Sequence, residues 1–112
     1  MKRTEIRKLD KIWAERVKER AGNKCEKCGK RQYLNSHHIF SRSNHSMRWN
    51  VENGVCLDSG CHTLKNDSAH KAPVEFIEWL RETRGEEWYN DLRREASKIK
   101  KLTYKEVWES LK

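Results

Sequence analysis

Four cysteines, arranged as two pairs, constrain this chain more than any other feature. Cys25 and Cys28 form a Cys-x-x-Cys turn, and Cys56 and Cys61 follow much later in the sequence. A turn of this spacing directs two thiolates toward one ion, and a second pair can complete a tetrahedral four-sulfur zinc site. Only 35% of the 112 residues are hydrophobic, so a structural metal would supplement a thin core.

The fourth zinc ligand has two candidates. Cys56 and Cys61 have four residues between them instead of the usual two. Asp58 lies two positions after Cys56, on the same face of an expected strand, and its carboxylate is the alternative ligand. The competing interpretation of all four cysteines is that they are buried thiols that bind no metal.

The apolar pattern predicts an α+β chain with one domain over residues 1–112. Residues 4–21 have helical spacing, residues 32–39 and 54–58 have strand character, and residues 61–70 are expected to form a short helix. The C-terminal third is helical, and Thr103 and Glu106 form a capping box before its last helix. The predicted segments are a basic N-terminal helix (1–22), a zinc knuckle and core (23–72), and a helical extension (73–112).

The net charge of +8 is concentrated at the start of the chain. Residues 1–31 carry a net charge of +7, residues 32–72 carry +1, and residues 73–112 are neutral. A basic N-terminal segment favours a polyanionic partner such as nucleic acid, although a solvated helix face has the same composition. No signal peptide or membrane-spanning run is present, so we expect a cytoplasmic protein without a membrane partner, in which cysteines are more often metal ligands than disulfides.

All five histidines lie between positions 37 and 70, which packing alone does not explain. His37 and His38 are adjacent, so on a strand their side chains point to opposite faces and can divide two roles. His62 follows Cys61 directly, and Asn66 lies one helical turn later, a spacing suited to two ligands of one ion. We expect His45 to be an ordinary surface or core residue, and the sequence assigns no role to His70.

The region of residues 22–72 resembles the HNH endonuclease family (ββα-metal nucleases), especially its small phage-type members with a zinc knuckle. The resemblance rests on five stretches: Cys25-x-x-Cys28, Ser36–Ile39, Arg48–Asn50, Asn53–Leu57 and Cys61-His62. In zinc-bearing members the third cysteine occupies the position of Asp58, whereas this chain has its cysteine two residues earlier, at Cys56.

The resemblance implies an endonuclease that hydrolyses DNA phosphodiester bonds. No feature of the sequence suggests a base-reading helix and one active site cuts one strand, so we expect nicking with low sequence specificity. It implies His38 as general base and Asn53 as the residue that organises the loop. One divalent cation (Mg, Mn or Ni) would be held by His37, His62 and, as a third ligand, Asn66. The implied structural zinc would be held by Cys25, Cys28, Cys56 and Cys61, with Asp58 as the alternative to Cys56.

Two arginines are candidate phosphate ligands. Arg42 and Arg48 flank the expected hairpin and could hold phosphates or simply solvate the loop.

Two other functions fit the sequence. The first alternative function is a non-catalytic zinc-binding nucleic-acid module. The second is an accessory subunit of a phage DNA-packaging machine, with the terminase or another DNA-processing protein as partner in the host cytoplasm. The sequence leaves the oligomeric state open.

Overall fold

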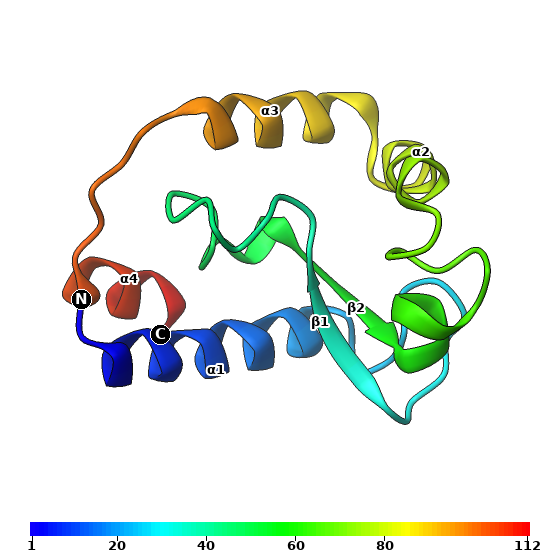
Figure 1. Ribbon diagram of the computed structural model, residues 1–112, viewed down its shortest axis with the longest axis horizontal. Coiled ribbons are helices and arrows are strands. Elements are labelled where there is room, and N and C mark those ends of the chain that lie inside the picture. Colours follow the sequence, from blue (N-terminus) through cyan, green and yellow to red (C-terminus); the bar gives the residue numbers. More distant parts are fainter.

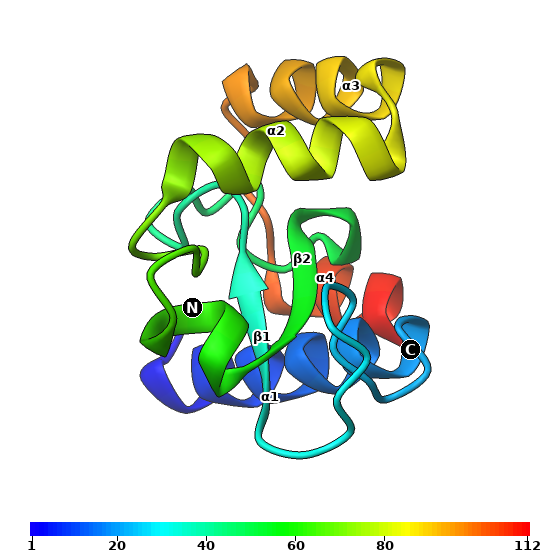
Figure 2. The same cartoon turned by 90° about the vertical axis from the view of Figure 1, so that its right-hand side faces the viewer.

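A computed structural model describes residues 1–112 and contains a two-stranded antiparallel sheet between two layers of helices (Figures 1 and 2). Helix α1 lies on one side of the hairpin, and helices α2 and α3 lie on the other. The expected α+β class is confirmed. The elements are α1 (Arg3–Arg20), β1 (Leu34–His38), the turn η1 (Val51–Asn53), β2 (Gly54–Asp58), the turn η2 (Gly60–Leu64), α2 (Pro73–Arg84), α3 (Glu86–Ser97) and α4 (Tyr104–Leu111).

The hairpin separates two hydrophobic clusters because alternate residues of β2 point to opposite faces. Every residue of β2 is buried. Cys56 packs with the apolar stripe of α1, whereas Val55 and Leu57 pack toward α2. The register pairs Ser36 with Cys56 and His38 with Gly54. The two histidines of β1 therefore lie at the end of the strand where the chain leaves the sheet.

Helix α1 follows the predicted spacing, and its buried residues are Leu9, Trp13 and Val17. A Cβ atom at Gly54 would lie 2.3 Å from a methyl carbon of Val17, so this close approach of β2 to α1 requires glycine. Helix α4 adds Val107 to the same cluster. No helix of the chain combines the length and the apolar composition that a membrane span requires.

The C-terminal helices begin and end where local sequence predicts. Pro73 is the first residue of α2, and Gly85 separates α2 from α3 with a φ of 99°, a conformation that favours glycine. Thr103 caps α4, its hydroxyl oxygen accepting a hydrogen bond from the backbone N–H of Glu106 at 3.2 Å. The expected Thr103 cap is confirmed, but the Glu106 carboxylate accepts from the Thr103 hydroxyl at 3.0 Å and not from its backbone N–H, so the reciprocal bond of a capping box is absent.

The prediction of a short helix over residues 61–70 is wrong beyond Leu64, where the helical turn ends. The helical turn is wide, with the N–H of Lys65 donating to the carbonyl of Gly60, and Lys65 itself is extended. The chain then folds back on the turn. The N–H groups of Ala69 and His70 donate to the carbonyl oxygens of Cys61 and His62.

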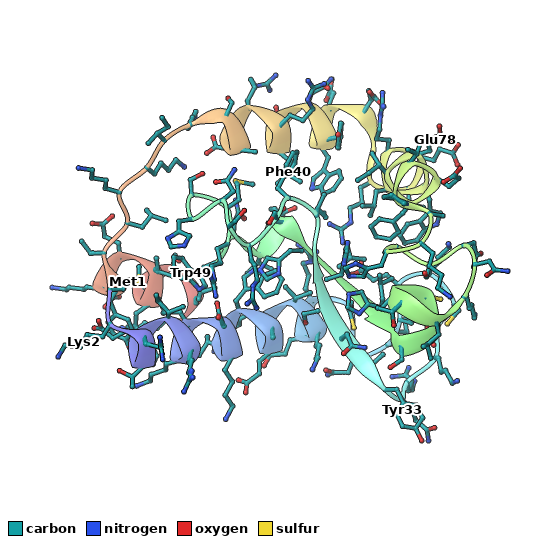
Figure 3. All side chains as sticks on the ribbon, in the orientation of Figure 1. Met1, Lys2, Tyr33, Phe40, Trp49 and Glu78 are labelled. Carbon is teal, nitrogen blue, oxygen red and sulfur yellow. The ribbon has the colours of Figure 1, made fainter.

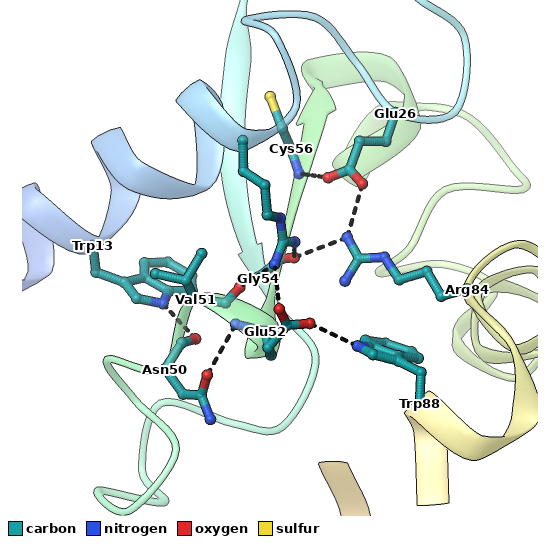
Figure 4. A network of polar contacts seen from close by, with 10 residues as sticks. Trp13, Glu26, Asn50, Val51, Glu52, Gly54, Cys56, Arg84 and Trp88 are labelled. Atoms are coloured by element: carbon teal, nitrogen blue, oxygen red, sulfur yellow. Dashed lines mark hydrogen bonds and ion pairs between the residues drawn. The ribbon is translucent and has the colours of Figure 1, made fainter. Parts of the chain in front are cut away.

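A polar network ties the knuckle, the hairpin and α2 together (Figure 4). The Glu26 carboxylate accepts hydrogen bonds from the backbone N–H of Cys56 at 2.7 Å and from the Arg84 guanidinium at 2.8 Å. Arg84 and Arg20 both donate to the carbonyl oxygen of Gly54. The start of β2 is thereby held by side chains from three separate segments.

Candidate functional site

The structure brings together three cysteines and one aspartate at the end of the hairpin. The potential ligand atoms of Cys25, Cys28, Asp58 and Cys61 all lie within 4.8 Å of one another. Cys25 and Cys28 come from the knuckle turn, where the N–H of Gly29 donates to the carbonyl of Cys25 at 2.9 Å. The Cys28 thiol donates to an Asp58 carboxylate oxygen at 3.2 Å. This Cys₃Asp group joins the knuckle turn to the end of β2 and the start of η2, which are distant from the knuckle in sequence.

This donor set is compatible with a structural zinc ion. Sulfur ligands on one zinc at about 2.3 Å lie about 3.8 Å apart, so the observed spacing needs only small side-chain rotations. Three of the four residues are buried. Lys65 places its ammonium 3.9 Å from the Cys61 sulfur, where it would offset the negative charge of the ligand set.

The expectation that Cys56 is the fourth zinc ligand is corrected by this geometry. Cys56 is fully buried, belongs to the cluster that packs on α1, and lies outside the Cys₃Asp group. Burial, reinforced by nearby Glu26, raises the pKa of its thiol to about 11. Asp58, the alternative ligand, occupies the fourth position because β2 ends there and the chain turns: the N–H groups of Gly60 and Cys61 donate to its carboxylate.

Asp58 and the Cys61 thiol shift each other's pKa. The hydrogen bond from the Cys61 thiol is the main reason that the pKa of Asp58 is well below its usual range. Burial, and then Asp58, raises the pKa of the Cys61 thiol. A bound divalent cation would reverse this preference, because a coordinating thiol loses its proton.

A second group of potential ligands consists of His37, His62 and His70. Their ring nitrogens also lie within 4.8 Å of one another, and the Nε2 atoms of His62 and His70 are 3.0 Å apart. His37 comes from β1, His62 from η2, and His70 from the segment that folds back on η2. The sequence predicted the first two residues of this group and missed His70.

Asn66, the third ligand expected from helical spacing, is not part of the histidine group. The helical turn stops at Leu64, so the residue four positions after His62 does not share its face. Asn66 is exposed in the turn that follows. His70 takes its place because its N–H bonds to the carbonyl of His62 at 3.1 Å. The only sequence signal for His70 was the confinement of all histidines to one stretch of the chain.

The histidine group lines a pocket of about 590 Å³ between the hairpin and α2. His37, His38, His62, His70 and Arg42 contribute to its wall, and no aspartate or glutamate does. Burial, followed by repulsion from the neighbouring imidazoles, lowers the pKa of His37 to about 3. Burial also lowers the pKa of His62. Both rings are therefore neutral at physiological pH, the state in which imidazole binds metals.

His38 lies on the same pocket but outside the histidine group. Its ring stacks on Trp13, with centroids 3.9 Å apart and planes 8° apart. Its Nε2 is 3.0 Å from the carbonyl oxygen of Arg48. A carbonyl only accepts, so Nε2 carries the proton and Nδ1 of the neutral ring keeps a free lone pair. Burial lowers the pKa of His38.

Asn53 is fully buried and fixes the loop that connects the strands. Its side-chain oxygen accepts a hydrogen bond from the N–H of Phe40 at 2.8 Å. Its amide group donates to the carbonyl oxygens of Phe40 at 3.0 Å and Met47 at 3.2 Å. The Arg48 carbonyl that receives the His38 hydrogen bond is the next one along the chain, so Asn53 indirectly holds that acceptor.

The two arginines expected to hold phosphates have different surroundings. Arg48 forms a paired interaction with the Asp10 carboxylate, at 2.9 and 2.7 Å, and its side chain is 13% exposed. Trp49, which points from the loop into the α1–α4 cluster, also donates to Asp10 (Figure 3). Arg48 therefore fastens the loop to α1. Arg42 is exposed on the pocket and has no ion-pair partner.

Comparisons of this chain with protein-family models, with curated proteins and with solved structures gave no match.

Proposed function

We propose that this chain is a metal-dependent endonuclease of the HNH type that hydrolyses DNA phosphodiester bonds. One observation carries the proposal. A single pocket is lined both by His38, which has a free ring nitrogen, and by a group of imidazoles suited to bind a metal. Phosphodiester hydrolysis needs both a base for the attacking water and a cation at the phosphate.

His38 is the proposed general base. Its Nε2 donates to the Arg48 carbonyl, and its ring lies flat on Trp13, so neither contact uses Nδ1. Nδ1 can therefore accept a proton from a water molecule in the pocket. The Arg48 carbonyl would stabilise the resulting imidazolium through the same hydrogen bond, which strengthens when the donor is charged.

His37 and His62 are the proposed ligands of the divalent cation. When bound, such a cation neutralises charge that develops on the phosphate oxygens and on the leaving 3′ oxygen. The chain's own contribution is to hold the two imidazoles close together in the pocket wall while His38 stays outside the ligand group. The Cys₃Asp group is proposed to hold a separate structural zinc, which fixes Cys61 and hence the neighbouring His62.

Charge around the pocket supports an anionic substrate. Arg42 faces the pocket without an ion-pair partner, and no carboxylate lines the wall. The exposed basic residues of α1 add a positive surface that would bind the phosphate backbone regardless of sequence. We therefore propose low sequence specificity and cleavage of one strand per active site.

The test is conversion of supercoiled plasmid by purified, zinc-loaded protein with added Mg²⁺, Mn²⁺ or Ni²⁺. We expect metal-dependent open circles from the wild type and a loss of at least about 100-fold in rate from His38→Ala, the lower range for a general base. His45→Ala is the matched control, because His45 is exposed and lies outside this pocket.

Two outcomes would contradict the proposal. If His38→Ala cut as fast as the wild type, His38 would not be the base. If the folded, zinc-loaded wild type bound DNA but failed to cut it with any of the three added cations, the chain would be a zinc-containing nucleic-acid-binding module. Binding is measured by gel shift on the same plasmid without added divalent cation and without a chelator, so that the structural zinc is retained and binding is measured separately from cutting.

A further inference from the structure

His70 lies where a third ligand of the histidine group would be, although nothing in its sequence spacing suggested this. We propose that His37, His62 and His70 form one three-imidazole site that binds a late first-row transition metal ion, such as Ni²⁺, Co²⁺ or Zn²⁺, and not Mg²⁺. The binding site stands on its own geometry, whereas its consequence for cleavage rests on the proposed function.

The spacing of the nitrogens supports a shared ion. Two imidazole nitrogens bound to one ion at about 2.0–2.1 Å lie about 2.9–3.4 Å apart for tetrahedral or octahedral angles. The Nε2 atoms of His62 and His70 are 3.0 Å apart. The His37 ring is 5.1 Å from each of the other two rings, measured between centroids, and nearly perpendicular to that of His70. One ring nitrogen from each residue lies within 4.8 Å of the other two, so small side-chain rotations would bring all three onto one ion.

Backbone hydrogen bonds hold the segments of His62 and His70 together, and ring packing positions His37. The N–H of His70 donates to the carbonyl of His62, and the N–H of Ala69 donates to the carbonyl of Cys61. Cys61 is itself part of the Cys₃Asp group, so a metal there would fix the segment that carries both His62 and His70. His37 packs nearly perpendicular to the ring of Phe76 from α2, with centroids 5.2 Å apart.

The available donors determine the class of metal. The pocket wall contains no carboxylate. The Ser36 hydroxyl donates to the carbonyl of Ala14 on the α1 side, and the Ser41 hydroxyl pairs with that of Ser43. Mg²⁺ requires oxygen ligands, usually including carboxylates, whereas imidazole suits zinc, nickel and copper. An ion at this site would therefore be a transition metal.

Exposure of His70 leaves one side of the site open. His37 and His62 are half-buried, whereas His70 is exposed. A closed four-ligand site would be structural, but three protein ligands with an open side are typical of catalytic metal sites. This opening faces the pocket that also contains His38 and Arg42.

The experiment titrates Co²⁺ and Ni²⁺ into full-length protein that already holds one zinc per chain, with binding measured by calorimetry and by the visible absorption of cobalt. We expect one further ion per chain and no thiolate-to-cobalt charge-transfer band. His70→Ala should lower affinity at least about 100-fold, because loss of a direct ligand exceeds the 10- to 100-fold cost of losing an outer-shell partner. Asn66→Ala is the matched control and should bind like the wild type.

Each result separates this inference from the proposed function. Equal affinity in His70→Ala and the wild type would remove His70 from the site, while leaving a nuclease with two histidine ligands intact. Tight Mg²⁺ binding at the same site would overturn the proposed metal class. Loss of Co²⁺ binding in His70→Ala, together with no DNA cleavage by metal-loaded wild type, would support the site and overturn the nuclease proposal. Circular dichroism of each variant confirms that the fold is retained.

Discussion

The imidazole of His38 lies flat on the indole of Trp13, and the two rings come from segments far apart in the chain. Trp13 is buried on the apolar face of α1, and its Nε1 donates to the carbonyl of Asn50 at 2.8 Å. The indole is thereby fixed both to the helix and to the loop that provides the other His38 contact. The basic N-terminal helix therefore has two proposed roles: its Trp13 side chain positions the ring of His38, and its exposed basic residues form a positive surface.

Replacing Trp13 should reduce both stability and cleavage. Trp13→Ala removes a fully buried ring and should lower the free energy of unfolding by about 3–5 kcal/mol. Trp13→Phe keeps a flat ring beside His38 but loses the hydrogen bond to Asn50, which adds about 0.5–1.5 kcal/mol to the cost of the smaller ring. Urea denaturation measures the free energy of unfolding of both variants, and the plasmid assay measures their cleavage. Trp88→Phe, which loses a bond to the exposed Glu52 carboxylate, is the control and should cost less.

Zinc content distinguishes the two candidates for the fourth ligand. Cys56→Ala should retain one zinc per chain, because Cys56 packs on α1 and lies outside the Cys₃Asp group. Asp58→Ala should bind zinc at least about 100-fold more weakly, because loss of a direct ligand exceeds the cost of losing an outer-shell partner, and a chelator should unfold it more readily than the wild type. Metal analysis after dialysis against graded chelator gives both values. Loss of zinc from Cys56→Ala alone would reverse the assignment.

Local sequence patterns predicted most of the elements. The stripe of Leu9, Trp13 and Val17 gave the position of α1, and the apolar run at Gly54–Asp58 gave β2 with its observed bounds. The Thr103 cap gave the start of α4. Each of these depends on residues within a few positions of one another, so helical or strand periodicity contains the needed information.

The parts that sequence reasoning missed depend on contacts between distant segments. Arg48 looks like a free loop cation, but Asp10, 38 positions earlier, pairs with it. His70 joins His62 only because the chain reverses after Leu64, and no period describes that return. Asp58 replaces Cys56 because the strand ends and the direction of the side chain changes there. Spacing rules assume a continuing helix or strand, and the failures at His70 and Asp58 occur where one stops, whereas the Arg48–Asp10 pair joins a loop to a distant helix.

Asn53 should contribute to stability mainly through its amide hydrogens. Asn53→Asp preserves the size of the side chain and can still accept from Phe40, but it cannot donate to the carbonyls of Phe40 and Met47. A buried group left without a partner costs about 1–3 kcal/mol, so we expect a loss of at least about 2 kcal/mol in urea denaturation. Asn50→Asp, in the same loop, is the control. A neutral result at Asn53 would show that the loop conformation does not depend on these bonds.

The Asp10–Arg48 pair should make stability depend on pH at the acidic end. Partial burial opposes ionisation of Asp10, but the hydrogen bonds from Arg48 and Trp49 outweigh it and lower its pKa below the ordinary 3.8. A carboxylate with a lowered pKa in the folded state contributes stability that is fully present above 3.8 and is lost as the pH falls through the lowered value. Asp10→Asn removes this contribution, so its unfolding free energy should be lower than that of the wild type at neutral pH, and the difference should shrink as the solution is acidified.

Glu15→Gln, at an exposed position of α1, is the control, and its stability should change with pH as that of the wild type does. Urea midpoints measured across the acidic range test this prediction. A difference in stability between Asp10→Asn and the wild type that stays constant with pH would contradict it. The pair would then anchor the loop to α1 without a difference in the pKa of Asp10 between the folded and unfolded states.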